Sequence, residues 1–135
     1  MALTDSEIQA VVAELSDEAL TTPYPGRWEY HPGDERVTIG VDPGLTTIVV
    51  DRADGTVRIV DADGESLVNS SPTALVACAR EYTTALENSI LSAADADWDA
   101  VGEALLERLR TIDPAAVEDE NSMWSFAAEE VGYGM

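Results

Sequence analysis

The sequence predicts a single α+β domain in which an N-terminal helix, an antiparallel β-meander sheet of about four to six strands, and C-terminal helices follow one another. Apolar residues recur at helical spacing near both ends of the chain, whereas the middle is rich in alternating and β-branched residues. The length of 135 residues suits one domain, so we treat residues 1–135 as one unit.

Residues 4–20 are predicted to form the N-terminal helix. Thr4 and Glu7 have the spacing of a capping box, in which the Thr hydroxyl accepts from the third helical amide and the Glu reaches back to the cap. An apolar stripe follows, made of Ile8, Val11, Val12 and Leu15. Pro23 and Pro25 then prevent the helix from continuing, because proline removes an amide donor and clashes with the preceding turn.

The middle of the chain is predicted to be a β-meander. Asp-Gly and Gly-containing turns separate the extended segments, because these residues tolerate the positive φ of tight turns. The expected strands are residues 36–40, 46–50, 56–60 and 66–69. The segment Trp28-Glu29-Tyr30 is expected to enter the same sheet.

Helical spacing returns in the C-terminal part. Residues 72–88 are predicted to form one helix, and Asp97 is expected to cap the next, whose stripe runs to Ile112. Asp113-Pro114 should begin a turn with Pro at its first position. Residues 120–131 are expected to form a last short helix.

The charge balance is strongly acidic. The chain carries 27 Asp and Glu residues against seven basic residues, all of them Arg, for a formal net charge of −20. Such a surface repels nucleic acid and anionic membranes, so we expect neither as a partner. It favours encounter with a basic protein. The same acidity is also typical of adaptation to high salt, and both interpretations stay open.

The sequence also predicts a cytoplasmic location. Its first residues lack the basic and apolar regions of a signal peptide, and no apolar run approaches the roughly 20 residues of a membrane span. The one cysteine, Cys78, excludes an internal disulfide and lies on the apolar stripe of its predicted helix.

The segment Asn69-Ser70-Ser71-Pro72 decides whether an enzyme should be expected. A nucleophilic serine needs a base and favours a Gly-x-Ser-x-Gly turn, but no glycine flanks Ser71 and the one histidine, His31, is distant in sequence. Ser71 followed by Pro72 instead has the pattern of a helix start. We therefore interpret the segment as a structural motif and predict no catalytic residue.

Acidic residues around the hairpin turns raise the question of a cation site. Neither a loop starting at Asp51 nor one starting at Asp61 places its glycine at the sixth position that a calcium-binding EF-hand loop needs. We interpret both as solvated turns and predict no metal site and no cofactor.

Several segments together resemble a known family. Residues 48–60 (IVVDRADGTVRIV) and 67–82 (LVNSSPTALVACAREY) place two strands around an Asp-x-x-x-Gly hairpin and then an Asn-Ser-Ser step into a helix. Residues 112–135 place an acidic segment before a Trp in a short helix near a Gly, and residues 37–40 (VTIG) fit a first core strand. In this order the segments resemble the fourth subfamily of the SUKH superfamily.

The resemblance implies an α+β binding module without an active site. SUKH proteins are typically immunity proteins that bind and neutralise toxin domains of bacterial polymorphic toxin systems, and this subfamily is associated with nucleases and deaminases. A basic toxin domain would then be the protein partner. Two other functions stay open: a regulatory or scaffold SUKH-like module outside toxin systems, and a metal-dependent hydrolase that uses the Asp-rich hairpins.

For the partner-binding residues we predict a footprint that combines aromatic and acidic side chains. Aromatic residues often dominate the energy of interfaces, whereas acidic residues speed association with a basic partner. The predicted contacts are Trp28, Tyr30, Asp61, Asp63 and Glu65.

Overall fold

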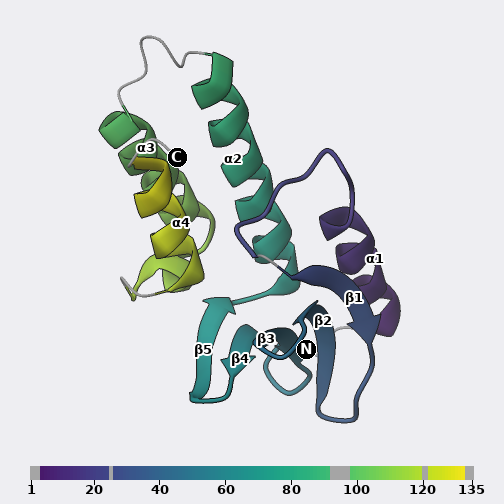
Figure 1. Cartoon of the computed structure of the whole chain (residues 1–135). Coiled ribbons are helices and arrows are strands. Elements are labelled where there is room, and N and C mark those ends of the chain that lie inside the picture. Colours follow the sequence, from purple (N-terminus) through teal and green to yellow (C-terminus); the bar gives the residue numbers. More distant parts are fainter. Residues whose placement is uncertain (1–3, 25, 92–97, 120–121, 133–135) are drawn as a thin grey trace.

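The computed structural model describes residues 4–24, 26–91, 98–119 and 122–132. An antiparallel sheet of five strands, in the order β1-β2-β3-β4-β5, carries helices on one side (Figure 1). The strands are β1 (Arg27–His31), β2 (Arg36–Asp42), β3 (Thr46–Asp51), β4 (Val57–Asp61) and β5 (Gly64–Asn69). The helices are α1 (Asp5–Leu15), α2 (Pro72–Leu91), α3 (Trp98–Ile112), the 3₁₀ helix η1 (Pro114–Val117) and α4 (Met123–Gly132). The α+β meander that the sequence predicts is confirmed.

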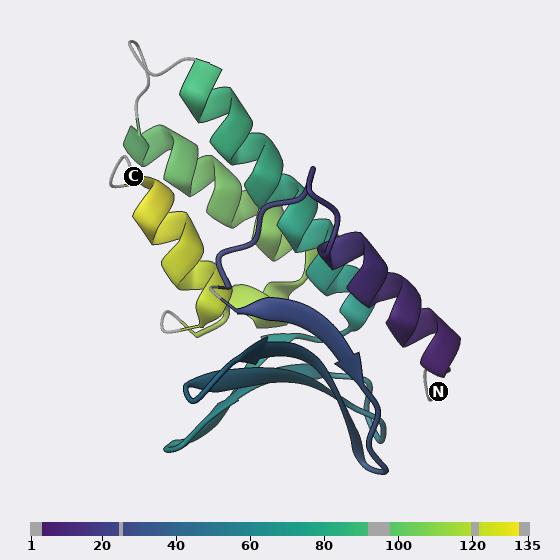
Figure 2. The same cartoon turned by 45° about the vertical axis from the view of Figure 1, so that its right-hand side comes forward.

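The core lies between the sheet and the helices. Figure 2 shows the sheet below the helices, with its other face turned away from them. Alternation along the strands sends every second side chain toward the helices. The fully buried apolar strand residues are Val37, Ile39, Ile48, Val50, Val57 and Val68. They meet helix residues that include Leu75, Leu105, Leu109, Trp124 and Val131.

Helices α3 and α4 pack with their backbones unusually close, and a glycine permits it. A Cβ atom added at Gly102 would lie 2.8 Å from the carbonyl oxygen of Ala128 and 2.8 Å from the Cα atom of Gly132. Any side chain at position 102 would therefore push α4 away from α3.

The N-terminal helix begins as predicted and ends earlier. The Thr4–Glu7 capping box is present. The helix stops at Leu15 rather than Leu20, because the Ser16 hydroxyl binds the Val12 carbonyl and the Asp17 carboxylate accepts from the Ala19 amide in a local turn. Local side-chain bonding thus competes with the last predicted turn of helix.

The last helix begins later than the predicted residue 120. Ser122 caps it, since its hydroxyl accepts from the Ser125 amide at 3.2 Å, and the helix runs from Met123 to Gly132. Pro114 stands in the first turn of η1, as expected, although the Asp113 side chain makes no capping bond there. The predicted cap at Asp97 lies outside the described residues.

Candidate partner-binding site

The Asn69–Pro72 segment connects the sheet to α2, and Ser71 acts as a helix cap. The Ser71 hydroxyl accepts from the Ala74 amide at 3.1 Å, and its carbonyl accepts from the Leu75 amide at 3.1 Å. Pro72 is the first residue of the helix. His31 lies in β1, where its Nε2 atom is 3.0 Å from Glu29. The capping interpretation of Ser71 is confirmed.

The two preceding residues join the sheet to the C-terminal helices. The Asn69 amide nitrogen donates to the Asp113 carboxylate at 2.9 Å, and the Trp124 indole donates to the Asn69 side-chain oxygen at 2.7 Å. Ser70 donates to the same carboxylate through its backbone amide at 2.8 Å and its hydroxyl at 2.9 Å. We call Asn69, Ser70, Asp113 and Trp124 the junction cluster.

Three members of the junction cluster are buried, whereas Ser70 is exposed. Asn69 and Trp124 are 0% exposed and Asp113 is 3% exposed. Within the described residues, no buried side-chain nitrogen or oxygen lacks a hydrogen-bond partner. The sequence analysis did not identify Asp113 as the partner of Asn69, because Asp-Pro has the pattern of an exposed turn start and no local signal indicates burial. The cluster joins the sheet to the C-terminal helices, and its buried members are closed to a ligand.

Cys78 lies beside this cluster. Its Sγ atom is 3.5 Å from the Asn69 amide nitrogen, and the residue is fully buried. Burial raises the pKa of the Cys78 thiol to about 11, so the thiol stays protonated at neutral pH. This environment makes Cys78 a core residue, as its place on the apolar stripe predicts.

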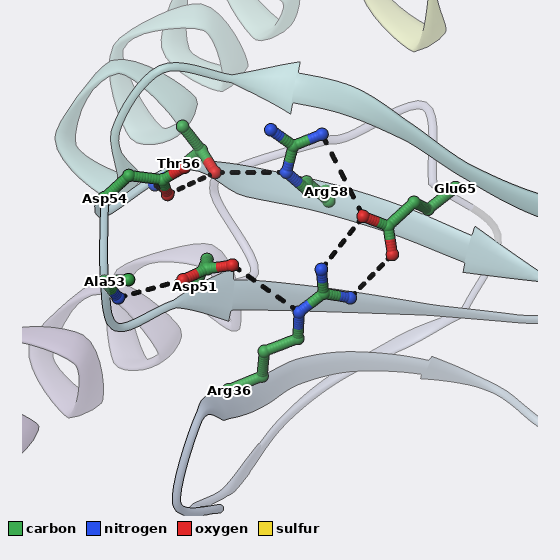
Figure 3. A network of polar contacts seen from close by, with 7 residues as sticks. All are labelled: Arg36, Asp51, Ala53, Asp54, Thr56, Arg58 and Glu65. Atoms are coloured by element: carbon green, nitrogen blue, oxygen red, sulfur yellow. Dashed lines mark hydrogen bonds and ion pairs between the residues drawn. The ribbon is translucent and has the colours of Figure 1, made fainter.

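A network of ion pairs spans the sheet face that the helices leave open (Figure 3). Arg36 of β2 donates two hydrogen bonds to the carboxylate of Glu65 in β5, at 2.6 and 2.9 Å. Its Nε atom lies 3.7 Å from Asp51, and Arg58 approaches Glu65 at 4.0 Å. We call Arg36, Asp51, Arg58 and Glu65 the sheet-face network.

The network alters the acidity of Glu65. The hydrogen bonds from Arg36 lower the pKa of Glu65 below its ordinary value. The pKa of Asp54, beside the network, is lowered chiefly by hydrogen bonds from Thr56, whose hydroxyl lies 2.7 Å away. Glu65 therefore already has a cationic partner within the chain, which the sequence analysis did not foresee.

The three acidic residues of the predicted footprint lie together. Asp61, Asp63 and Glu65 line a shallow hollow of about 260 Å³ at the β4–β5 hairpin. The Asp61 carboxylate accepts from the backbone amides of Asp63 and Gly64, at 2.8 and 3.0 Å, and so shapes the turn. We call Asp61, Asp63 and Glu65 the acidic hairpin.

The two aromatic residues of that footprint lie elsewhere. Trp28 and Tyr30 belong to β1, at the opposite edge of the sheet from β5. Both are half-buried against the core, and the Trp28 ring centroid lies 5.4 Å from that of Tyr24. The structure thus places the aromatic and the acidic halves of the footprint apart, and the combined footprint stays a prediction.

Two further hollows adjoin α4. One, of about 330 Å³, is lined by Pro23, Ile59, Ser66, Met123, Phe126, Ala127 and Glu130. The other, of about 460 Å³, lies between α3 and α4 and includes Asp99, Glu103, Arg110 and Glu118 among its lining residues. The sequence analysis missed Phe126, although its position outside the inward stripe of Trp124, Ala127 and Val131 indicates an exposed aromatic ring.

Two kinds of site can be examined directly in the described residues. They contain no group of three or more His, Cys, Asp or Glu side chains placed to hold a metal ion. None of the described helices is long and apolar enough to cross a membrane. The geometry provides solvent-facing hollows with acidic rims, which suit protein contact.

Comparison with known proteins yields one relationship. Residues 15–130 match the family model of the SUKH-4 immunity proteins. Searches of curated proteins and of solved structures found no match to the chain. The matched range includes the five strands and the junction cluster.

Proposed function

Because the chain belongs to the SUKH-4 immunity protein family, we propose that it binds a cognate polymorphic toxin domain of nuclease or deaminase type and neutralises it. The family match over residues 15–130 is the observation that carries this proposal. The protein acts by occupying the toxin, in the cytoplasm of the cell that makes both, and performs no chemistry itself.

The charge of the chain supports a basic toxin. Enzymes that act on nucleic acids need cationic surfaces to hold phosphates. A chain with a formal net charge of −20 attracts such a surface over a Debye length of about 10 Å at 0.1 M salt. The acidic partner therefore competes for the same face that the toxin uses for its substrate.

The acidic hairpin is the first part of the proposed contact. Asp61 and Asp63 project from an exposed turn, and Glu65 follows at the start of β5. Trp28 and Tyr30 are the second part of the proposed contact, as aromatic anchors. To reach them, the toxin would approach β1 from its open edge. Because the two parts lie at opposite edges of the sheet, separate substitutions at each can tell which one the toxin touches.

A growth assay tests the proposed function. The gene next to this chain is first examined for a C-terminal toxin domain, and that domain is then produced in bacteria from an inducible promoter, with or without the chain. We expect growth arrest with the toxin alone and normal growth when the chain is present. A neighbourhood of metabolic genes without a toxin, or a toxin that still arrests growth, would contradict the proposal.

A titration with purified proteins distinguishes binding from chemistry. The toxin's activity should fall linearly with added chain and reach zero at a fixed molar ratio, and removing the chain should restore it. Polyglutamate of matched total charge is the control, since it reproduces the acidity without the fold. Equal inhibition by polyglutamate would reduce the effect to nonspecific electrostatics, and loss of activity at trace amounts of chain would indicate catalysis.

A further inference from the structure

Phe126 is an exposed aromatic side chain on α4. Its side chain is 49% exposed. Among the described residues, the one other exposed large hydrophobic residue is Leu45, at 68%. The neighbouring helix positions Trp124, Ala127 and Ala128 fill the core. Exposed aromatic rings beside a hollow are typical of contact surfaces, because they bury large apolar area at little entropic cost.

The surface around Phe126 is continuous with the acidic hairpin. Ile59 and Ser66 line both the hollow that contains Phe126 and the hollow that contains Asp61, Asp63 and Glu65. The two hollows, of about 330 and 260 Å³, therefore form one surface that runs from α4 across the exposed end of β5 to the hairpin. We call this the Phe126 surface.

The charge of the Phe126 surface specifies its partner. Its charged lining residues are Asp61, Asp63, Glu65 and Glu130, and none of the described residues that line the two hollows is basic. Glu65 is paired with Arg36, which leaves Asp61, Asp63 and Glu130 to attract an external cation. The α3–α4 hollow is acidic too, since Asp99, Glu103, Glu118 and Glu129 line it, but it also contains Arg110. Charge therefore suits a cationic partner at both hollows, and the exposed ring of Phe126 distinguishes the Phe126 surface.

The position of β5 leaves room for that partner. In the described sheet, β5 has a neighbour on one side only, and Gly64, Glu65 and Ser66 are exposed. A segment of another protein can lie along this edge with one side chain in the hollow between Ile59 and Phe126 and its cationic side chains at the hairpin.

We propose that the Phe126 surface is the toxin-binding site, and that it takes a basic segment of the toxin whose apolar side chain packs on Phe126 and Met123. This inference rests on the proposed function. It assigns the apolar contacts to Phe126 and Met123 in place of Trp28 and Tyr30 of β1. Phe126 limits dissociation, whereas Asp61 and Asp63 speed association.

Surface plasmon resonance with the inactivated toxin domain encoded next to this chain tests the proposal. Phe126→Ala should weaken binding roughly tenfold or more, mainly through faster dissociation, and Phe126→Leu should retain part of the affinity. Leu45→Ala is the matched control, since it removes the other exposed large side chain, and it should bind like the parent. Circular dichroism and urea unfolding verify that each variant is folded.

Two variants that each remove one negative charge test the acidic half of the site. Asp63→Asn should slow association and flatten its salt dependence, whereas Asp99→Asn in the α3–α4 hollow should leave both unchanged. If the parent neutralises the toxin but Phe126→Ala binds like the parent, the proposed site is wrong. The proposed site is also wrong if Asp99→Asn slows association and Asp63→Asn does not. If the parent does not bind the toxin, the proposed function itself fails.

The alternative occupant of the Phe126 surface is a second copy of the chain, and light scattering tests for it by measuring the mass in solution. We expect the parent and Phe126→Ala to have the same mass in solution. A parent dimer that Phe126→Ala dissociates would assign this surface to self-association and overturn the proposal.

Discussion

The junction cluster and the sheet-face network are both polar connections between distant segments, yet their surroundings differ. Asn69 and Asp113 are 0% and 3% exposed. The side chains of Arg36 and Glu65 are 36% and 37% exposed, although their contact is shorter than those of the junction. Distance alone would rank the network as the stronger connection.

Burial reverses that ranking. In the junction, a lost partner leaves the buried Asn69 amide or the buried Trp124 indole without an acceptor, and each unsatisfied buried group costs about 1–3 kcal/mol. In the network, water replaces a lost partner, and exposed ion pairs contribute little to stability. The junction therefore adds buried polar bonds to the apolar contacts that hold the helices on the sheet, whereas the network adjusts the charge of the open face.

The largest effect is expected for Asp113→Ala. This change leaves the Asn69 amide, the Ser70 hydroxyl and the Ser70 backbone amide without their acceptor. The free energy of unfolding, measured in urea, should fall by about 3 kcal/mol. Asp99→Ala is the exposed control and should leave the urea midpoint nearly unchanged. A similar small effect from both would mean that water enters the junction.

Ser71→Ala should have an intermediate effect. It removes the hydroxyl that caps α2 and is expected to lower the free energy of unfolding by about 1 kcal/mol. Ser71→Asp retains a capping oxygen and should restore most of the loss. Toxin binding per folded molecule should not change, and a variant with full stability but no neutralising activity would contradict the capping role.

Arg36→Gln should hardly change stability. Its partners Asp51 and Glu65 are open to water, which solvates them when the guanidinium is absent. We expect the urea midpoint to stay within error of the parent at neutral pH. A drop as large as that of Asp113→Ala would break the distinction between the two regions.

The pKa of Glu65 should respond to the same variant. Its pKa in the folded state lies below the ordinary 4.5, so its stabilising contribution is present above that value and is lost as pH falls through the folded pKa. In Arg36→Gln the pKa should rise toward the ordinary value, as followed by NMR of the side-chain carboxyl. Asp5 is the internal control, because the hydrogen bond from Arg52 lowers its pKa in both proteins. An unchanged Glu65 pKa would show that Arg36 does not hold it in solution.

Local chemistry makes much of this fold predictable. The capping box at Thr4, the Asp54-Gly55 hairpin and the Ser71-Pro72 helix start all depend on neighbours within a few residues, and each occurs as predicted. Gly55 adopts a φ of 73°, the left-handed conformation that makes Asp-Gly a hairpin signal. The helix boundaries at Leu15 and Met123 were missed by a few residues, because Ser and Asp side chains compete locally with helical bonds.

The sequence by itself therefore determined the elements, their order, their inward stripes and the resemblance to the family. Only the tertiary structure decided which distant polar residues meet: Asn69 with Asp113 and Trp124, and Arg36 with Glu65. It also decided that the hollow beside Phe126 adjoins the hollow of the acidic hairpin. The physical reason is that periodicity specifies which face of an element is apolar, whereas a polar partner 29 to 55 residues away is selected by how the faces pack. Burial, which decides the strength of each contact, arises only from that packing.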